Sequence, residues 1–152
     1  MAEPLIAKHV LEFAYTRSLG PTLTTFFTGL RDKKVFGSKT AGGRVIVPPT
    51  PHDPETGEVV SELVEVSDAG VVTTWAWVSN PRPKHPLDKP FAWALVQLDG
   101  ADTAMLHAVD AGKESKMATG MRVRARWADE TVGYMTDIEC FEPATPERSV
   151  AE

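Results

Sequence analysis

The sequence predicts a mainly β protein whose strands close into a small five-stranded barrel, preceded by an N-terminal helical segment. Five or six short stretches rich in β-branched and aromatic residues follow one another between residues 59 and 141, separated by turn-forming residues. One short helix or helical turn, expected within residues 110–120, comes before the fourth barrel strand. This order of elements over about 80 residues is that of the OB-fold barrel, and a β-sandwich is the alternative.

The first element is a helix, predicted at about residues 22–33. Pro21 suits the first helical turn, where the N–H that proline lacks would have no partner. Apolar residues then follow at helical spacing, namely Leu23, Phe26, Phe27 and Leu30. Their face is too wide for an isolated helix, so we expect it to pack on the rest of the protein. The preceding stretch 11–18 alternates weakly and is either strand or coil.

The second segment, residues 37–60, is rich in glycine and proline and holds one short strand candidate at 44–47. The predicted barrel strands lie in 61–66, 71–78, 91–98, 103–109, 121–127 and 134–141. Asp99 to Asp102 reads as a hairpin connection, and residues 80–90 form a proline-rich loop. The organisation that we predict is one compact domain with four parts: 1–36, 37–60, 61–143 and a flexible polar tail at 144–152.

Composition excludes several classes of protein. The net charge of −5 argues against a nucleic-acid partner, which usually needs a basic face. A single cysteine, Cys140, cannot form an internal disulfide. The chain has no run of roughly 18 apolar residues and no signal-peptide pattern at its start, so we expect a cytoplasmic protein without a membrane span.

No catalytic residue is predicted, because no motif of an activated nucleophile or a phosphate-binding loop is present. We interpret Cys140 as a small core residue. None of the four histidines has a histidine or cysteine at metal-ligand spacing, so no metal site is predicted from them. His107 shares a strand face with Thr103 and Met105, which is typical of a barrel histidine whose hydrogen bonds are satisfied.

Two surface features have a structural and a functional interpretation, and the sequence leaves both open. Arg122, Arg124 and Arg126 alternate with apolar residues along one strand. They are either a solvated outer face or a contact for anions, such as a partner subunit or nucleotide phosphates. Trp75 and Trp77 share a strand face and are either core or part of an exposed interface patch.

Three motifs give the chain a family resemblance. They are Gly-Leu-Arg-Asp at 29–32, the pair Pro48-Pro49, and Thr-Gly-Met-Arg-Val at 119–123. In this order and spacing, from about Thr22 to Pro143, the chain resembles the domain-of-unknown-function-35 (DUF35) family. These are OB-fold proteins with an N-terminal helix and a rubredoxin-like zinc ribbon, and they are associated with acyl-CoA metabolism.

The resemblance implies a ribbon at residues 37–60, but the residues at its ligand positions contradict a bound zinc. The family's four cysteine positions match Ser38, Ala41, Asp53 and Thr56 in this chain, followed by Gly57. Of these side chains only the carboxylate is a plausible zinc ligand. We therefore expect a degenerate, metal-free ribbon held by turns, with an Asx turn that starts at Asp53 and closes at Gly57.

The resemblance also implies a function. Such proteins are accessory subunits of thiolase-like, lipid-transfer-protein-type aldolases or acyltransferases that act on acyl-CoA, with retro-aldol cleavage of a steroid side chain as one such reaction. It implies a hetero-oligomer with a thiolase-like subunit, a hydratase-like protein as a further partner, no tightly bound cofactor, and acyl-CoA as the substrate of the complex.

Within this interpretation, the residues that we expect to contact CoA phosphates or the partner are Arg44, Arg122, Arg124 and Arg126. The alternative function is an OB-fold protein that binds single-stranded nucleic acid, although the acidic composition weighs against it. A hydrolase or aldolase that works without a partner is a weaker third hypothesis.

Overall fold

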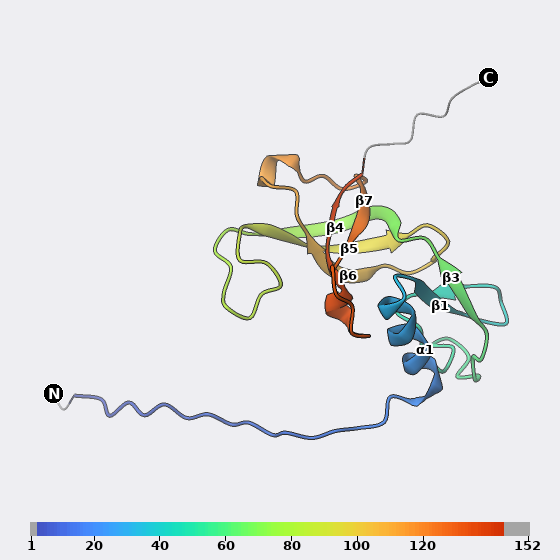
Figure 1. The fold of residues 1–152 in the computed structure, drawn as a ribbon, viewed down its shortest axis with the longest axis horizontal. Coiled ribbons are helices and arrows are strands. Elements are labelled where there is room, and N and C mark those ends of the chain that lie inside the picture. Colours follow the sequence, from blue (N-terminus) through green and yellow to red (C-terminus); the bar gives the residue numbers. More distant parts are fainter. Residues whose placement is uncertain (1–2, 145–152) are drawn as a thin grey trace.

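The structure is a computed structural model that describes residues 3–144 (Figure 1). Its elements in chain order are α1 (Gly20–Arg31), β1 (Val35–Lys39), β2 (Val45–Ile46), β3 (Leu63–Val66), β4 (Ala69–Val78), β5 (Phe91–Leu98), β6 (Met105–Val109), the 3₁₀ turn η1 (Glu114–Lys116), β7 (Arg122–Trp127), the 3₁₀ turn η2 (Met135–Asp137) and β8 (Ile138–Pro143).

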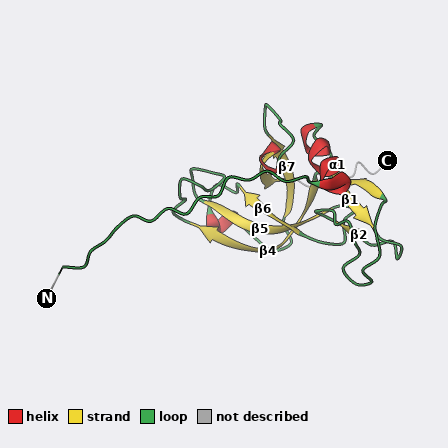
Figure 2. Ribbon diagram, turned by 90° about the horizontal axis from the view of Figure 1, so that it is seen from below, coloured by secondary structure: helices red, strands yellow, loops and turns green. Residues whose placement is uncertain are grey.

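Five strands close into a barrel in the order β4-β5-β6-β8-β7, which confirms the predicted OB-fold class (Figure 2). All neighbouring pairs are antiparallel except β6 and β8, which are parallel and meet at Val109 and Phe141. A register shift between Val72 and Thr74 interrupts the long strand β4. Such irregularities bend a strand, and this one follows the residues at which β4 pairs with both β5 and β7, namely Gly70 and Val71.

A second, three-stranded sheet has the order β2-β1-β3. Its central strand, β1, was not expected, because Gly37 and Ser38 make its sequence unlike that of a strand. Gly37 is needed there, since a Cβ would lie 2.8 Å from the side chains of Val45 and Val47. Strand β3 pairs with β1 and not with a barrel strand, so the barrel's own strands begin at Ala69.

Helix α1 confirms the helix predicted near residues 22–33, with Pro21 in its first turn. It buries Phe26 and Leu30 in the main core, and its Gly29 lies so close to Phe36 that a Cβ there would be 2.6 Å from the ring. Removing a buried phenylalanine side chain typically costs about 3–5 kcal/mol, so Phe26 is one of the residues that fix the helix to the protein.

Two of the connections between strands agree with the predictions from the sequence. The predicted hairpin between β5 and β6 contains Gly100 at φ 92°, a conformation that favours glycine. The predicted helical turn is η1, and the last strand is preceded by η2, which was not predicted. No helix within residues 3–144 has the length and apolar character that a membrane crossing requires.

Residues 3–19 form an extended arm that contains neither helix nor strand, so the coil interpretation of the stretch 11–18 is confirmed. The arm leads away from the domain (Figures 1 and 2). The predicted tail lies outside the described residues except for Ala144.

Candidate functional site

An apolar cleft of about 420 Å³ lies where β5 and β6 meet η2 and the proline-rich loop. This volume is within the range of pockets that bind small molecules or anchor side chains, roughly 300–1,000 Å³. The cleft is lined by Pro86, Trp93, Leu106, His107, Met135, Thr136, Ile138 and Glu139. Its walls therefore come from β5, β6, η2, the first part of β8 and the proline-rich loop.

An aromatic cluster holds the proline-rich loop against the barrel at this cleft. The ring of His85 packs edge-on against Phe91 and Trp93, with centroids 5.6 and 6.4 Å away. Its Nδ1 also accepts a hydrogen bond of 3.2 Å from the backbone N–H of Arg82. Phe91 is fully buried, whereas Trp93 is half-buried and presents part of its ring to the cleft.

The apolar surface continues from the cleft along the outer face of β5 and β6. Leu95 and Leu106 lie directly opposite each other in the ladder, and both are exposed. An exposed apolar patch that adjoins an apolar cleft is typical of an interaction surface. For Trp75 and Trp77 the sequence left open whether they are core residues or part of an exposed interface. Both are partly buried against the main core, and neither lines the cleft.

His107 lies in the cleft wall and is buried, as predicted for a satisfied barrel histidine. Burial lowers its pKa below the usual range, and hydrogen bonds with the backbone of Met135 and Ala108 oppose this shift only in part. The Ala108 N–H donates to its Nδ1 over 2.9 Å. The imidazole is therefore neutral near pH 7 and adds no charge to the cleft.

Cys140, on β8, is fully buried. It packs in a cluster with Leu87, Phe91 and Ala108. Burial raises the pKa of its thiol to about 11. Since the thiolate is the reactive form, this cysteine is a core residue, as the sequence indicated, and not a nucleophile.

The four arginines expected to contact an anion do not form one site, and among the described residues only Arg124 and Arg126 share a carboxylate partner, Glu142. Arg44 lies next to β2 and donates to the Glu55 carboxylate over 2.6 Å. Arg122, on β7, makes two parallel hydrogen bonds of 2.7 and 2.5 Å with Asp99. None of the four lines the cleft.

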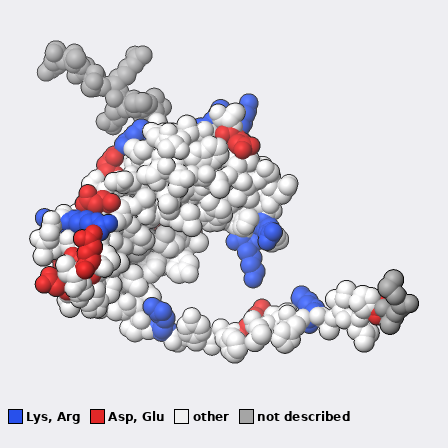
Figure 3. Space-filling model, turned by 180° about the vertical axis from the view of Figure 1, so that it is seen from behind, with Lys and Arg blue, Asp and Glu red and all other residues white. Residues whose placement is uncertain are grey.

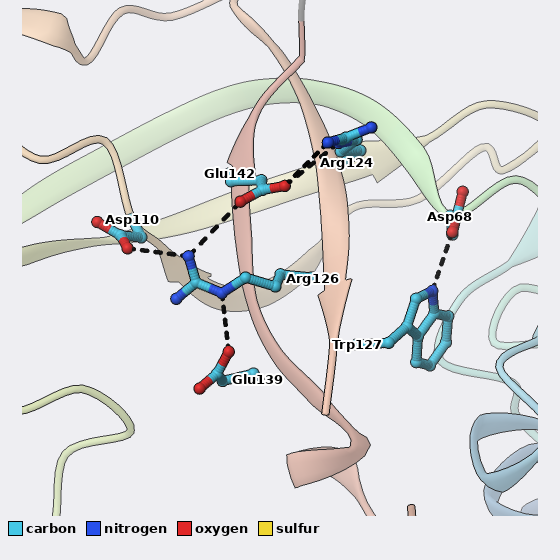
Figure 4. A network of polar contacts seen from close by, with 7 residues as sticks. All are labelled: Asp68, Asp110, Arg124, Arg126, Trp127, Glu139 and Glu142. Atoms are coloured by element: carbon cyan, nitrogen blue, oxygen red, sulfur yellow. Dashed lines mark hydrogen bonds and ion pairs between the residues drawn. The ribbon is translucent and has the colours of Figure 1, made fainter. Parts of the chain in front are cut away.

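Arg124 and Arg126 belong to a network of ion pairs on the outer face of the barrel (Figure 4). Arg124 pairs with Glu142 over 3.2 Å, while Arg126 pairs with Glu139 over 2.8 Å and Asp110 over 3.1 Å. These partners raise the pKa of Arg126. An anionic ligand would have to compete with carboxylates already in place, so the proposed role of these arginines in binding CoA phosphates stays a prediction.

Asp110 is the buried member of this network. Burial raises the pKa of its carboxyl group, but hydrogen bonds from Lys89 (2.7 Å) and Arg126 outweigh burial and hold the pKa below its usual value. The carboxylate thus links the end of the proline-rich loop to β7, which helps to fix the loop that forms one wall of the cleft.

The ribbon positions do not fit a zinc ion. The Ser38 hydroxyl is buried and accepts a hydrogen bond of 3.0 Å from the Thr50 N–H, and Ala41 has no donor atom. One oxygen of Asp53 accepts the Glu55 N–H over 2.8 Å, which forms the predicted Asx turn. Across residues 3–144 no three His, Cys, Asp or Glu side chains are placed so that they could hold a metal ion.

The barrel is similar in sequence to domains of known proteins. Residues 63–128 match the family defined by the C-terminal OB-fold domain of ChsH2. Residues 63–128 are an OB-fold domain of the DUF35 family. The DUF35 relative with the curated description "DUF35 domain-containing scaffold protein", from Pyrococcus furiosus, is 29% identical over 102 residues, which are 66% of this chain and 74% of that protein.

Two solved structures share the DUF35 fold of this chain. One is the Ltp2-ChsH2(DUF35) aldolase, with a TM-score of 0.62 and 20% identity over 86% of this chain and 100% of the matched chain. The other is a DUF35 protein from Sulfolobus solfataricus, with a TM-score of 0.57 and 23% identity over 70% of this chain and 78% of the other. At these identities the comparison supports the fold alone.

Sequence reasoning missed the cleft itself. The sequence draws attention to His107, but it does not connect this residue with Leu106, Met135 and Ile138. The alternation of β6 shows that Leu106 faces outward, and this was the one available signal. The convergence of β5, β6 and η2 depends on barrel closure, which the sequence does not encode locally.

Proposed function

We propose that this protein is a non-catalytic accessory subunit of a thiolase-like, lipid-transfer-protein-type aldolase or acyltransferase that acts on acyl-CoA. The observation that carries the proposal is the cleft, whose walls are mostly apolar and whose two titratable side chains, His107 and Glu139, already have partners within the protein. Such a site suits binding better than acid–base chemistry, for which a group must be free to exchange a proton with the substrate.

The relatives support a role in an assembly. One is described as a scaffold protein, and a structural neighbour is the DUF35 chain of an aldolase named for two components, Ltp2 and ChsH2. We carry this to the present chain as a proposal: it completes the enzyme assembly, and the partner performs the carbon–carbon cleavage. A steroid side chain attached to CoA is the substrate class to test first.

The alternative function, binding of single-stranded nucleic acid, gains no support from the arginines of β7. Binding of this kind needs a groove with a surplus of positive charge and exposed stacking rings. Arg122, Arg124 and Arg126 are each paired with at least one carboxylate, which cancels the positive charge of that face.

The test is co-expression of the full chain with thiolase-like proteins from its own genome, followed by size-exclusion chromatography with light scattering. We expect a stable hetero-oligomer with one of them, and acyl-CoA cleavage by the complex but not by this chain alone. Failure to form a complex with every such protein would contradict the proposal.

Two variants show whether the cleft is the contact. Leu106→Asp places a charge on the exposed apolar surface beside Trp93, and we expect it to weaken the complex at least tenfold, because a buried unpaired charge costs several kcal/mol. Val59→Asp is the matched control, since Val59 is equally apolar and exposed but lies on the turn of the ribbon.

A further inference from the structure

The arm of residues 3–19 has an unusual surface. Of the twelve large apolar side chains that are exposed in the described part of the chain, seven lie in this arm: Leu5, Ile6, Val10, Leu11, Phe13, Tyr15 and Leu19. Phe13 is 80% exposed and Tyr15 is 78% exposed. A segment of seventeen residues with this much unburied apolar surface is typical of a binding element and not of a solvated linker, which is usually polar.

The arm also has no contacts that would explain its composition within the domain. Between Glu3 and Ser18 no hydrogen bond and no ion pair to another described residue is found. Figure 3 shows the arm as a thread of mostly uncharged atoms, with open space between it and the barrel. Its backbone N–H and C=O groups are therefore available to a partner.

The order of side chains suits an extended bound conformation. Leu11, Phe13 and Tyr15 alternate with Glu12, Ala14 and Thr16, so an extended arm places these three large apolar side chains on one side. Extended segments of this kind bind by adding a strand to the edge of a partner's sheet, where alternate side chains enter pockets. No proline interrupts the backbone donors between Pro4 and Pro21.

The arm lies on the same side of the molecule as two elements that line the cleft, η2 and the proline-rich loop. In Figure 1 the arm passes below the barrel, on the side toward which η2 and the proline-rich loop project, and Figure 2 shows it from below. Helix α1, which follows the arm, contacts η2, and η2 forms part of the cleft wall. Fully extended, the seventeen residues of the arm span at most about 56–61 Å. Their side chains remain exposed.

We propose that residues 5–19 bind the partner enzyme subunit as an extended apolar arm, so that the partner is held between the arm and the cleft. This inference rests on the proposed function for the identity of the partner. It adds that part of the interface is a segment outside the DUF35 OB-fold domain. The arm and the cleft then contact the same partner, with the barrel supplying the rigid part of the interface.

The arm should increase the affinity for the partner chiefly because it is covalently linked to the domain that carries the cleft. Ordering a flexible segment opposes binding, so the arm alone binds weakly. Once the cleft has engaged the partner, the arm is held at an effective concentration on the order of millimolar, and linked weak contacts of this kind raise affinity by about 10²–10⁴-fold.

The experiment compares two arm variants of the full chain in the complex identified by co-expression. The first, Ile6→Ser/Leu11→Ser/Phe13→Ser/Tyr15→Ser, removes apolar side chains; the second, Lys8→Ser/Glu12→Ser/Arg17→Ser, is the control. The dissociation constant is measured by biolayer interferometry, and hydrogen exchange of arm amides is measured in the free protein and in the complex. Both variants should keep the melting temperature, because the substituted side chains are exposed and form no hydrogen bond or ion pair with another described residue.

We expect the apolar variant to weaken binding at least tenfold, the control to change it less than threefold, and the arm amides to be protected only in the complex. If the wild type and the apolar variant bind equally well, the proposed role of the arm is wrong, while the proposed function is not contradicted. Protection of the arm amides from hydrogen exchange in the free protein would also contradict this role, because the arm would then be packed on its own domain. Absence of any complex with the wild type contradicts the proposed function itself.

Discussion

Single residues show how the environment decides what a side chain can do. His107 and Cys140 carry side chains that many enzymes use in catalysis, yet each is buried and neutral. In both cases burial penalises the charged form, lowering the pKa of the imidazole and raising that of the thiol to about 11. Neither is positioned to act as a base or a nucleophile.

The lowered pKa of His107 predicts a pH dependence of stability. The native state favours the neutral imidazole, whereas the unfolded chain takes up a proton near pH 6.5. Stability is therefore complete above about pH 6.5 and falls as the pH drops toward the folded-state pKa, with a slope of at most about 1.4 kcal/mol per pH unit. Asp99 and Asp110, whose pKa values are also lowered, lose their contributions at more acidic pH.

Urea unfolding of the wild type and His107→Gln at pH 7, 6 and 5 checks this. The wild type should lose more stability than the variant between pH 7 and 5, whatever the difference in their absolute stability. Parallel losses in the two proteins would show that His107 is not responsible for the slope.

At the scale of elements, the loop before β8 packs against α1 and so holds the helix to the barrel. The buried Asp137 carboxylate accepts the N–H groups of Val132, Gly133 and Tyr134 at 2.7–3.1 Å. The same loop places Tyr134 against Phe27, with stacked rings 5.8 Å apart. The helix is thus held at the edge of the cleft by a carboxylate that is far from it in sequence.

Asp137→Ala should lower the free energy of unfolding by about 2–4 kcal/mol, because three backbone donors lose a charged acceptor. Asp137→Asn keeps one carbonyl oxygen and should lose less. The exposed neighbour Asp129, changed to Ala, is the control and should change stability by less than about 0.5 kcal/mol. Chemical denaturation measures all three, and faster hydrogen exchange in α1 for Asp137→Ala would show that the helix is loosened.

The ribbon is a second element whose stability can be tested. We expect no stoichiometric zinc by elemental analysis and an unchanged melting temperature in the presence of EDTA, because the turns at Ser38 and Asp53 are closed by hydrogen bonds. Ser38→Ala should cost about 1–3 kcal/mol by leaving the Thr50 N–H without its acceptor. Thr56→Ala, on an exposed turn with a bond of 3.3 Å, should cost much less. Bound zinc or loss of stability with EDTA would contradict the metal-free ribbon.

At the scale of the whole molecule, most elements could be predicted from local pattern. The stretch 91–98 alternates and is flanked by turn residues, so its limits as β5 match the prediction. Strand β1 could not be found in this way, because Gly37 and the buried Ser38 are explained only by the neighbouring strands that contact them. The same holds for η2, whose cap is formed within the folded loop.

The candidate site was less predictable than the fold. The alternation of Arg122, Arg124 and Arg126 correctly placed them on the outer face, but their partners come from β8, from the loop before η1 and from the β5–β6 hairpin. The charge available to a ligand depends on these partners, and pairing between strands is a property of the closed barrel.

The sequence by itself determined the OB-fold class, the helix before it, the core positions of His107 and Cys140, and the Asx turn of the ribbon. Each of these depends on residues close together in the chain, whose spacing and side-chain type restrict the local backbone. Only the tertiary structure decided where the apolar cleft lies, that the arginines are paired, and that the apolar arm is left without a partner in the domain. These are relations between distant segments, and they arise because closing the barrel brings β5, β6, β8 and the proline-rich loop together while no surface of the domain covers the arm.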